Sequence, residues 1–152
     1  MRRRISGQFV AASSGLAVSL RSGRGPRIII VAHGVDCAEC AAYAARLAGE
    51  EDALNEWGAR VTVVAPDGER AIAAPLAASG VEVLLSRDPA GTFGIAPAAL
   101  VVTDEWGEVY FSIRAGSGHE FPDPGEVIDW IRFVAIQCPE CEQPEGEWRS
   151  LP

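Results

Sequence analysis

The sequence contains no lysine; all thirteen of its basic residues are arginines. This absence excludes a lysine nucleophile and Schiff-base chemistry. The chain also lacks any run of 18 apolar residues, so we expect no membrane-spanning helix. Basic residues are outnumbered by 21 acidic residues, giving a net charge of −8. An acidic surface repels phosphate backbones, and we therefore expect no nucleic-acid partner.

The first twenty residues also lack the uninterrupted apolar stretch that is typical of a secretory signal peptide. Serine and glycine interrupt their apolar stretch, and this predicts an ordinary first hairpin and a cytoplasmic protein. Cysteines in that compartment rest as thiols, metal ligands or cycling redox groups rather than as permanent bridges. The 152 residues, 48% hydrophobic and 22% charged, are typical of one globular domain with a single core.

The hydrophobic pattern predicts alternating strands and helices. Strands are expected at 8–12, 17–21, 27–32, 61–65, 81–85, 98–103 and 108–113, and helices at 38–57, 67–78 and 126–136, with a turn or single helical turn at 88–94. The order strand–helix–strand–helix–strand implies parallel strands with right-handed crossovers, to which the last two strands add an antiparallel hairpin. We therefore predict an α/β fold with a central mixed sheet, helices on both faces and a short N-terminal hairpin.

Three parts of the chain are expected from this pattern. Residues 1–26 form an N-terminal extension, residues 27–137 form the main domain, and residues 138–152 form a polar tail with three prolines.

The most informative motif is Cys37-Ala38-Glu39-Cys40, placed after a β-branched strand and before a helix. It resembles the active site of the thioredoxin superfamily. The segment Gly94-Ile95-Ala96-Pro97, followed by the hairpin with its Asp104–Gly107 turn, is similar to the redoxin branch, which includes alkyl hydroperoxide reductases and thiol-specific antioxidant peroxiredoxins. The resemblance implies a three-layer thioredoxin-like fold and an antioxidant or thiol–disulfide oxidoreductase activity. It also implies a cis peptide bond before Pro97, next to the cysteine pair.

The sequence departs from the pattern of these relatives at several positions. Val31 stands where thioredoxins carry a buried acid, and Gly34 stands where peroxiredoxins carry threonine or serine. Only Arg114 has a strand-end context that suits an arginine facing peroxide, and a surface role is the simpler interpretation of it. These differences count against peroxide reduction more than against redox activity itself.

The spacing of the two cysteines predicts their roles. Cys37, at the start of a helix, is the expected nucleophile, since unpaired N–H groups and the helix dipole there favour a thiolate. Cys40, one helical turn on, is the expected resolving thiol, so the redox pair needs no cofactor. His33 is expected to stabilise the thiolate or to shuttle a proton, although a plain loop histidine is an equal alternative. Pro97 and the backbone of Ala96 are expected to contact an extended substrate.

A second pair, Cys138-Pro139-Glu140-Cys141, follows the last helix. Three explanations are open: a second dithiol that passes electrons to the first, half of a Cys₄ zinc site completed in a homodimer, or an inert tail. His119, in a Gly- and Pro-rich loop, is predicted to have no special role. The expected partners are protein or small-molecule disulfides and peroxides. The rival hypothesis is a non-enzymatic zinc-binding or interaction module on the same fold.

Overall fold

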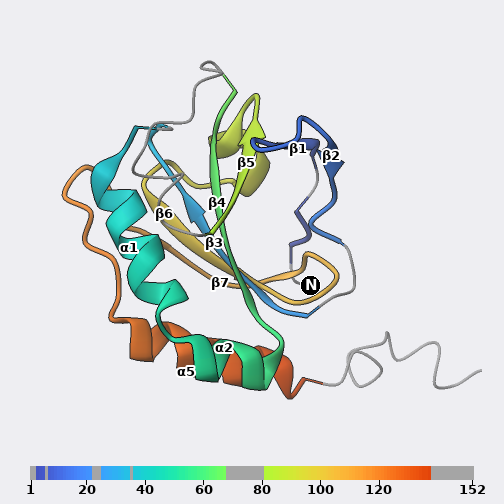
Figure 1. Ribbon diagram of the computed structural model, residues 1–152, viewed down its shortest axis with the longest axis vertical. Helices are drawn as coiled ribbons and strands as arrows, with labels where there is room; N and C mark the ends of the chain where they lie inside the picture. Colours follow the sequence, from blue (N-terminus) through green and yellow to red (C-terminus); the bar gives the residue numbers. More distant parts are fainter. Residues whose placement is uncertain (1–2, 6, 22–24, 35, 68–80, 138–152) are drawn as a thin grey trace, which may run out of the picture.

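The computed structural model describes residues 3–5, 7–21, 25–34, 36–67 and 81–137 (Figure 1). These residues build a seven-stranded mixed sheet in the order β2-β1-β5-β4-β3-β6-β7. The strands are β1 (Phe9–Ala11), β2 (Ala17–Val18), β3 (Arg27–Val31), β4 (Arg60–Pro66), β5 (Glu82–Ser86), β6 (Ala99–Thr103) and β7 (Val109–Arg114). The three strands β3, β4 and β5 are parallel, and β6, β7 and β1 are antiparallel to their neighbours. The predicted N-terminal hairpin is present as β1 and β2, and it extends this sheet through β5.

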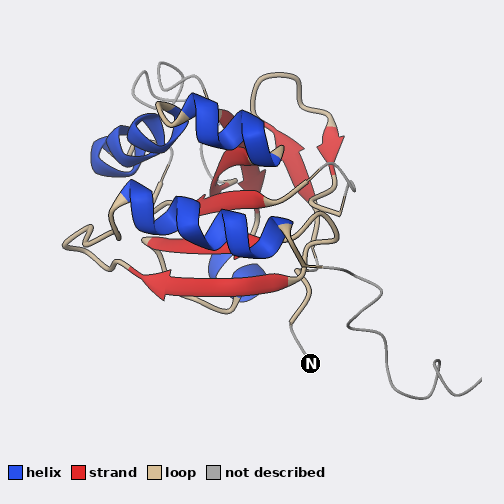
Figure 2. Cartoon of the chain, turned by 90° about the horizontal axis from the view of Figure 1, so that it is seen from below, coloured by secondary structure: helices blue, strands red, loops and turns tan. Residues whose placement is uncertain are grey.

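Helices lie on both faces of the sheet (Figure 2). The described helices are α1 (Ala38–Ala48), α2 (Glu51–Trp57), α4 (Pro89–Phe93) and α5 (Pro124–Ala135). One core cluster joins α1, α2 and α5 to one face of the sheet, and a second joins α4 and the N-terminal strands to the other. The predicted α/β architecture is therefore confirmed. None of the described helices has the length and apolarity that crossing a membrane requires.

The central strand β3 explains why the sheet is covered on both sides. All five of its residues are buried, with Ile28 and Ile30 in one core cluster and Ile29 and Val31 in the other. Successive side chains of a strand point to opposite faces, so a continuous β-branched run needs apolar partners on each. This places the carboxyl end of β3, and the cysteine motif after it, at one edge of a rigid two-sided core.

The continuous helix predicted at 38–57 is wrong in one respect, because the structure divides it into α1 and α2. The division falls at Gly49 and Glu50, and Glu50 has a non-helical ψ of 47°. Glycine inside a helix costs about 1 kcal/mol relative to alanine, which favours a break at that point. After the break, α2 packs against α5, and Gly58 ends it with a left-handed φ of 63° as predicted.

The hairpin of β6 and β7 closes through a turn that the sequence specifies well. The carboxylate of Asp104 accepts hydrogen bonds from the backbone N–H groups of Trp106 and Glu108, at 2.9 and 2.8 Å. Gly107 takes a positive φ of 78°. The predicted hairpin is therefore confirmed. Of the helix predicted at 67–78 only residue 67 is among the described residues, and the predicted tail at 138–152 lies outside them.

Candidate active site

Cys37 occupies the N-cap position of α1. Its backbone is extended, with φ −69° and ψ 103°, and its carbonyl oxygen accepts a hydrogen bond from the N–H of Ala41. No side-chain cap satisfies the first N–H groups of the helix. The sulfur therefore stands where unpaired N–H groups and the helix dipole favour negative charge, and it is only partly buried. This is the position predicted from the sequence, and the residue keeps part of its surface exposed to solvent.

Cys40 lies one turn further along α1, on the face that packs against the sheet. It is fully buried, and both cysteines are free thiols. Burial raises the pKa of the Cys40 thiol to about 12, and a side-chain hydrogen bond with Cys37 adds to this, while a backbone hydrogen bond at His33 partly offsets it. Cys40 is therefore held as a neutral thiol behind a more exposed sulfur, an asymmetry that separates the two cysteines chemically.

His119 is the residue that sequence reasoning missed. Its Nε2 atom lies 3.2 Å from the sulfur of Cys37, although the two residues are 82 positions apart in the chain. Its backbone is in the left-handed region, with φ 53°, just after a tight turn in which its N–H donates to Gly116 O at 3.1 Å. The only sequence signal was a histidine within a glycine-rich segment, which does not tell where the loop folds.

Contacts at both ends of the loop that carries His119, which joins β7 to α5 and is called the His119 loop below, hold it in place. Tyr43 of α1 donates a hydrogen bond from its hydroxyl to Pro122 O at 2.6 Å and stacks on Phe121 with ring centres 4.3 Å apart. At the other end of the loop, the N–H groups of Ala115 and Gly116 both donate to Ala98 O. Figure 1 shows this loop, between β7 and α5, running along the side of α1. The histidine is therefore fixed relative to the helix that carries both cysteines.

His33 is exposed, and its ring meets the ring of His119 edge to face at 4.9 Å between centres. Of the two histidines, His119 is the one in hydrogen-bond contact with the Cys37 sulfur, while the His33 ring contacts His119. One ligand atom from each of His33, Cys37, Cys40 and His119 lies within 4.8 Å of the other three. The structure therefore brings two thiols and two imidazoles into one cluster that is compact enough to hold a metal ion.

The segment around Pro97 lies at the same edge of the sheet. Ala99 pairs with Val31 at the end of β3, and Ala98 O anchors the start of the His119 loop. The cis peptide bond, however, lies between Pro97 and Ala98 rather than before Pro97. The predicted position is wrong by one bond: sequence favours a cis bond before a proline, and the structure has it after Pro97 instead. Ala96 is exposed and Pro97 half-buried.

The charged residues near Cys37 are acidic. Asp36 and Glu39 are both exposed, and a carboxylate oxygen of Glu39 lies 3.9 Å from the Cys37 sulfur. Arg114 ends β7 on an exposed stretch of that strand and pairs in register with Ala99. Exposed carboxylates act against a thiolate only weakly, because water screens them. The imidazole of His119, at 3.2 Å, is in closer contact with the sulfur than the carboxylate of Glu39.

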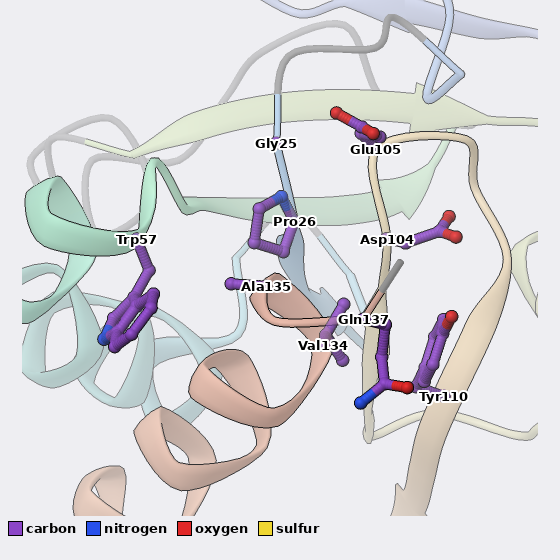
Figure 3. A pocket seen from close by; sticks show the side chains of 9 residues that line it. All are labelled: Gly25, Pro26, Trp57, Asp104, Glu105, Tyr110, Val134, Ala135 and Gln137. Carbon is purple, nitrogen blue, oxygen red and sulfur yellow. The ribbon is translucent and has the colours of Figure 1, made fainter. Parts of the chain in front are cut away.

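A pocket of about 180 Å³ lies elsewhere in the molecule (Figure 3). Pro26, Trp57, Asp104 and Tyr110 are among its lining residues. Because Arg27 pairs with Thr103, Pro26 and Asp104 mark the amino end of β3, whereas Cys37 follows its carboxyl end. The five residues of β3 separate these ends by roughly 16 Å. The pocket is therefore not part of the cysteine site.

The sheet order, the helices on both faces and the cysteine pair at the start of α1 define a thioredoxin-like fold. Solved structures agree with this assignment. An uncharacterized thioredoxin-like protein from Porphyromonas gingivalis matches with a TM-score of 0.61 at 22% identity, over 85% of this chain and 89% of that one. Peroxidoxin BcpB from Mycobacterium tuberculosis matches with a TM-score of 0.66 at 15% identity, over 90% of this chain and 97% of that one.

The thioredoxin domain of a thiol-disulfide oxidoreductase from Bacteroides vulgatus matches with a TM-score of 0.58 at 14% identity, over 88% of this chain and 99% of that one. No protein-family profile matches the sequence, and comparison with curated proteins gives no match. At these identities the likeness establishes the fold, and the chemistry has to be argued from the residues of the site.

The raised pKa of Cys40 predicts a loss of stability at alkaline pH. In the unfolded chain a thiol releases its proton near pH 9, whereas in the folded chain Cys40 keeps it until about pH 12. The folded state thus binds more protons between these values, and the contribution of Cys40 to the free energy of unfolding, complete below pH 9, is lost as the pH rises towards 12. Denaturant unfolding in reductant at pH 7 and pH 10.5 measures this loss. The Cys40→Ala variant should lose less stability between the two pH values than the unsubstituted protein, and an equal loss would contradict the assignment.

Proposed function

We propose that this protein is a thiol–disulfide oxidoreductase of the redoxin type, with Cys37 as the nucleophile and Cys40 as the resolving thiol. The observation that carries the proposal is the 3.2 Å contact between the sulfur of partly exposed Cys37 and His119 Nε2 at the start of α1, with the Cys40 thiol buried one turn behind. A thiolate is the attacking species in disulfide exchange, and both the helix start and the imidazole support its formation.

The first step is attack on a substrate disulfide. The Cys37 thiolate bonds to one substrate sulfur, and the other leaves as a thiolate that takes up a proton, so that a mixed disulfide forms. The imidazole of His119, in contact with the Cys37 sulfur, is positioned to take the proton of the Cys37 thiol and return it to the leaving sulfur.

The second step is resolution by Cys40. Its thiol loses a proton and attacks the Cys37 sulfur, the substrate sulfur leaves as a thiol, and the Cys37–Cys40 disulfide remains. Because the pKa of Cys40 is raised to about 12, this step requires a base. The imidazoles of His119 and His33 each place a ring nitrogen within 4.8 Å of the Cys40 sulfur, and His119 is the one in contact with Cys37. An external dithiol must then supply two electrons to restore the reduced pair.

Peroxide reduction is the second candidate activity. The Cys37 thiolate would attack one peroxide oxygen and release an alcohol, and Cys40 would displace water from the resulting sulfenic acid to form the same disulfide. Peroxidoxin BcpB is among the structures that this chain resembles, which favours this candidate. Gly34, which offers no hydroxyl to a bound peroxide, favours disulfide reduction instead.

The substrate surface that we propose is formed by Pro97 and Ala96 beside the sulfur. Its support is the position of this segment at the carboxyl end of β3, together with the exposure of Ala96. An extended chain can hydrogen-bond to backbone groups there, which suits a protein disulfide. A cycling cysteine pair of this kind fits a reducing compartment, so we propose that the protein acts in the cytoplasm.

The test is a stopped-flow comparison of the reduced protein with a protein disulfide and with hydrogen peroxide, followed by thiol counting. We expect oxidation of Cys37 and Cys40 to remove two free thiols per chain. We also expect the reduced protein to react faster with the protein disulfide than with hydrogen peroxide. Loss of no thiols with either oxidant would reject the proposal, whereas faster reaction with peroxide would select the peroxidase form.

The tail pair Cys138 and Cys141 lies outside the described residues, and its role stays a prediction. A second dithiol would speed reduction of the first pair by an external donor, and a shared zinc site would link two chains. Comparing the intact chain with the Cys138→Ser/Cys141→Ser variant, for donor rate and for molecular mass, separates these alternatives from an inert tail.

A further inference from the structure

One cluster of side chains contains more groups than disulfide exchange requires. Its members are His33, Cys37, Cys40 and His119. Exchange needs the two sulfurs and one base, yet a second imidazole stands edge to face against the first. The four potential ligand atoms come from three separate segments: the turn after β3, the start of α1 and the loop after β7.

We propose that the reduced pair binds one Zn²⁺ ion through Cys37, Cys40, His33 and His119. Two thiolates and two imidazoles are a donor set that zinc prefers, and four such donors complete its tetrahedron. The site would be closed, with no position left for a reacting water, so the ion would lock the cysteine pair rather than catalyse a reaction.

The distances fit this coordination after a small movement. Zinc–sulfur bonds of about 2.3 Å and zinc–nitrogen bonds of about 2.0 Å place tetrahedral ligand atoms roughly 3.3–3.8 Å apart. The Cys37 sulfur and His119 Nε2 are already 3.2 Å apart, and no pair among the four exceeds 4.8 Å. A pair at 4.8 Å therefore has to approach by about 1.0 Å if both atoms are sulfur and by about 1.5 Å if both are nitrogen. His33 is exposed and can make this adjustment, while buried Cys40 provides a fixed point.

Charge also favours a cation at this place. Binding displaces a proton from each thiol, so that Zn²⁺ and two thiolates form a neutral unit. The carboxylate of Glu39 lies 3.9 Å from the Cys37 sulfur, and its potential, although weakened by water, has the sign that suits a cation. None of the four proposed ligands is a lysine or an arginine, so the ligand set contains no permanent positive charge that would repel the ion.

Binding at these sulfurs and the proposed exchange chemistry are mutually exclusive. The ion has to leave before exchange can begin: two protons replace Zn²⁺ at the pair and leave two thiols, and this free dithiol then reduces the substrate disulfide to two thiols as the Cys37–Cys40 disulfide forms. Zinc is thus proposed as a brake on the site. The metal site itself rests on the geometry alone and does not require that the protein turns over a substrate.

The test uses the full chain carrying Cys138→Ser and Cys141→Ser, so that only the first pair can bind. Reduced protein titrated with Zn²⁺ against a competing chelator should bind one ion per chain. Co²⁺ in place of Zn²⁺ should give a sulfur-to-cobalt charge-transfer band and the visible bands of a tetrahedral ion. His33→Gln and His119→Gln should each weaken zinc binding by more than about tenfold, since even outer-shell partners of a metal contribute that much.

Three results would overturn the proposal: no stoichiometric zinc in the reduced protein, an octahedral cobalt spectrum, or unchanged affinity in both histidine variants. Circular dichroism of each variant confirms that it is folded. Turnover is measured separately with chelator present. Failure of turnover under chelator rejects the oxidoreductase, whereas turnover that one equivalent of zinc does not inhibit rejects the zinc brake.

Discussion

Replacing Cys37 by serine is expected to lower the rate of disulfide reduction by at least about 10³-fold, because a hydroxyl is not ionised at neutral pH and is a poor attacking group for sulfur. The serine oxygen would occupy the same helix start, beside the same imidazole, so that only the nucleophile changes. Insulin reduction with dithiothreitol as the electron donor measures the rate. Circular dichroism of the variant separates loss of the nucleophile from loss of the fold.

Cys40→Ser is the matched control within the same motif. It keeps the nucleophile and removes the resolving thiol, so Cys37 should still attack and then stay joined to its substrate as a mixed disulfide. Mass spectrometry under non-reducing conditions detects that adduct, which dithiothreitol should remove. Full activity in the Cys37→Ser protein, or an adduct on a cysteine other than Cys37 in the Cys40→Ser protein, would reject the assigned roles.

Replacing His119 by glutamine is expected to slow the reaction of Cys37 by about 10²-fold, the lower range for loss of a positioned general base. The imidazole nitrogen at 3.2 Å is the closest described group able both to take the proton of Cys37 and to stabilise the thiolate. Alkylation of reduced protein by iodoacetamide at neutral pH, followed by peptide mass mapping of Cys37, measures this reactivity directly. Glutamine retains a hydrogen-bonding side chain, so the loop is left with a partner of similar size.

His33→Gln provides the comparison for this prediction. The His33 ring contacts the ring of His119 rather than being in hydrogen-bond contact with Cys37, so its replacement should reduce the alkylation rate much less. Equal effects of both substitutions would assign the base to the pair and not to His119.

Much of the fold could be predicted from the sequence because its elements carry strong local signals. The β-branched run of β3, the Asp104–Gly107 turn and the glycine that ends α2 each have a local physical cause. The break between α1 and α2 was missed because Gly49 weakens a helix by only about 1 kcal/mol, a cost that packing can outweigh. Packing of α2 against α5 decides the outcome there, and no local pattern reports it.

The cysteines of the site were predictable and the histidine was not. Cys37 and Cys40 are three residues apart on one helix, so their relation follows from helix geometry. His119 reaches the same place through a loop whose course depends on stacking between Phe121 and Tyr43 and on a carbonyl at Ala98. These are long-range contacts, and sequence spacing alone carries no information on them. The same holds for the meeting of His33, Cys37, Cys40 and His119 in one cluster.

Tyr43 lies a single turn beyond Cys40 on α1, and through Phe121 and Pro122 it fastens the segment that carries the imidazole. One helix thus carries both sulfurs on its own backbone and holds the His119 loop beside them through an aromatic contact and a hydrogen bond. The loop has a second anchor at the Ala98 carbonyl, beside β6. The distance between the Cys37 sulfur and the imidazole thus depends on both anchors, and a change at either would move the imidazole relative to the sulfur.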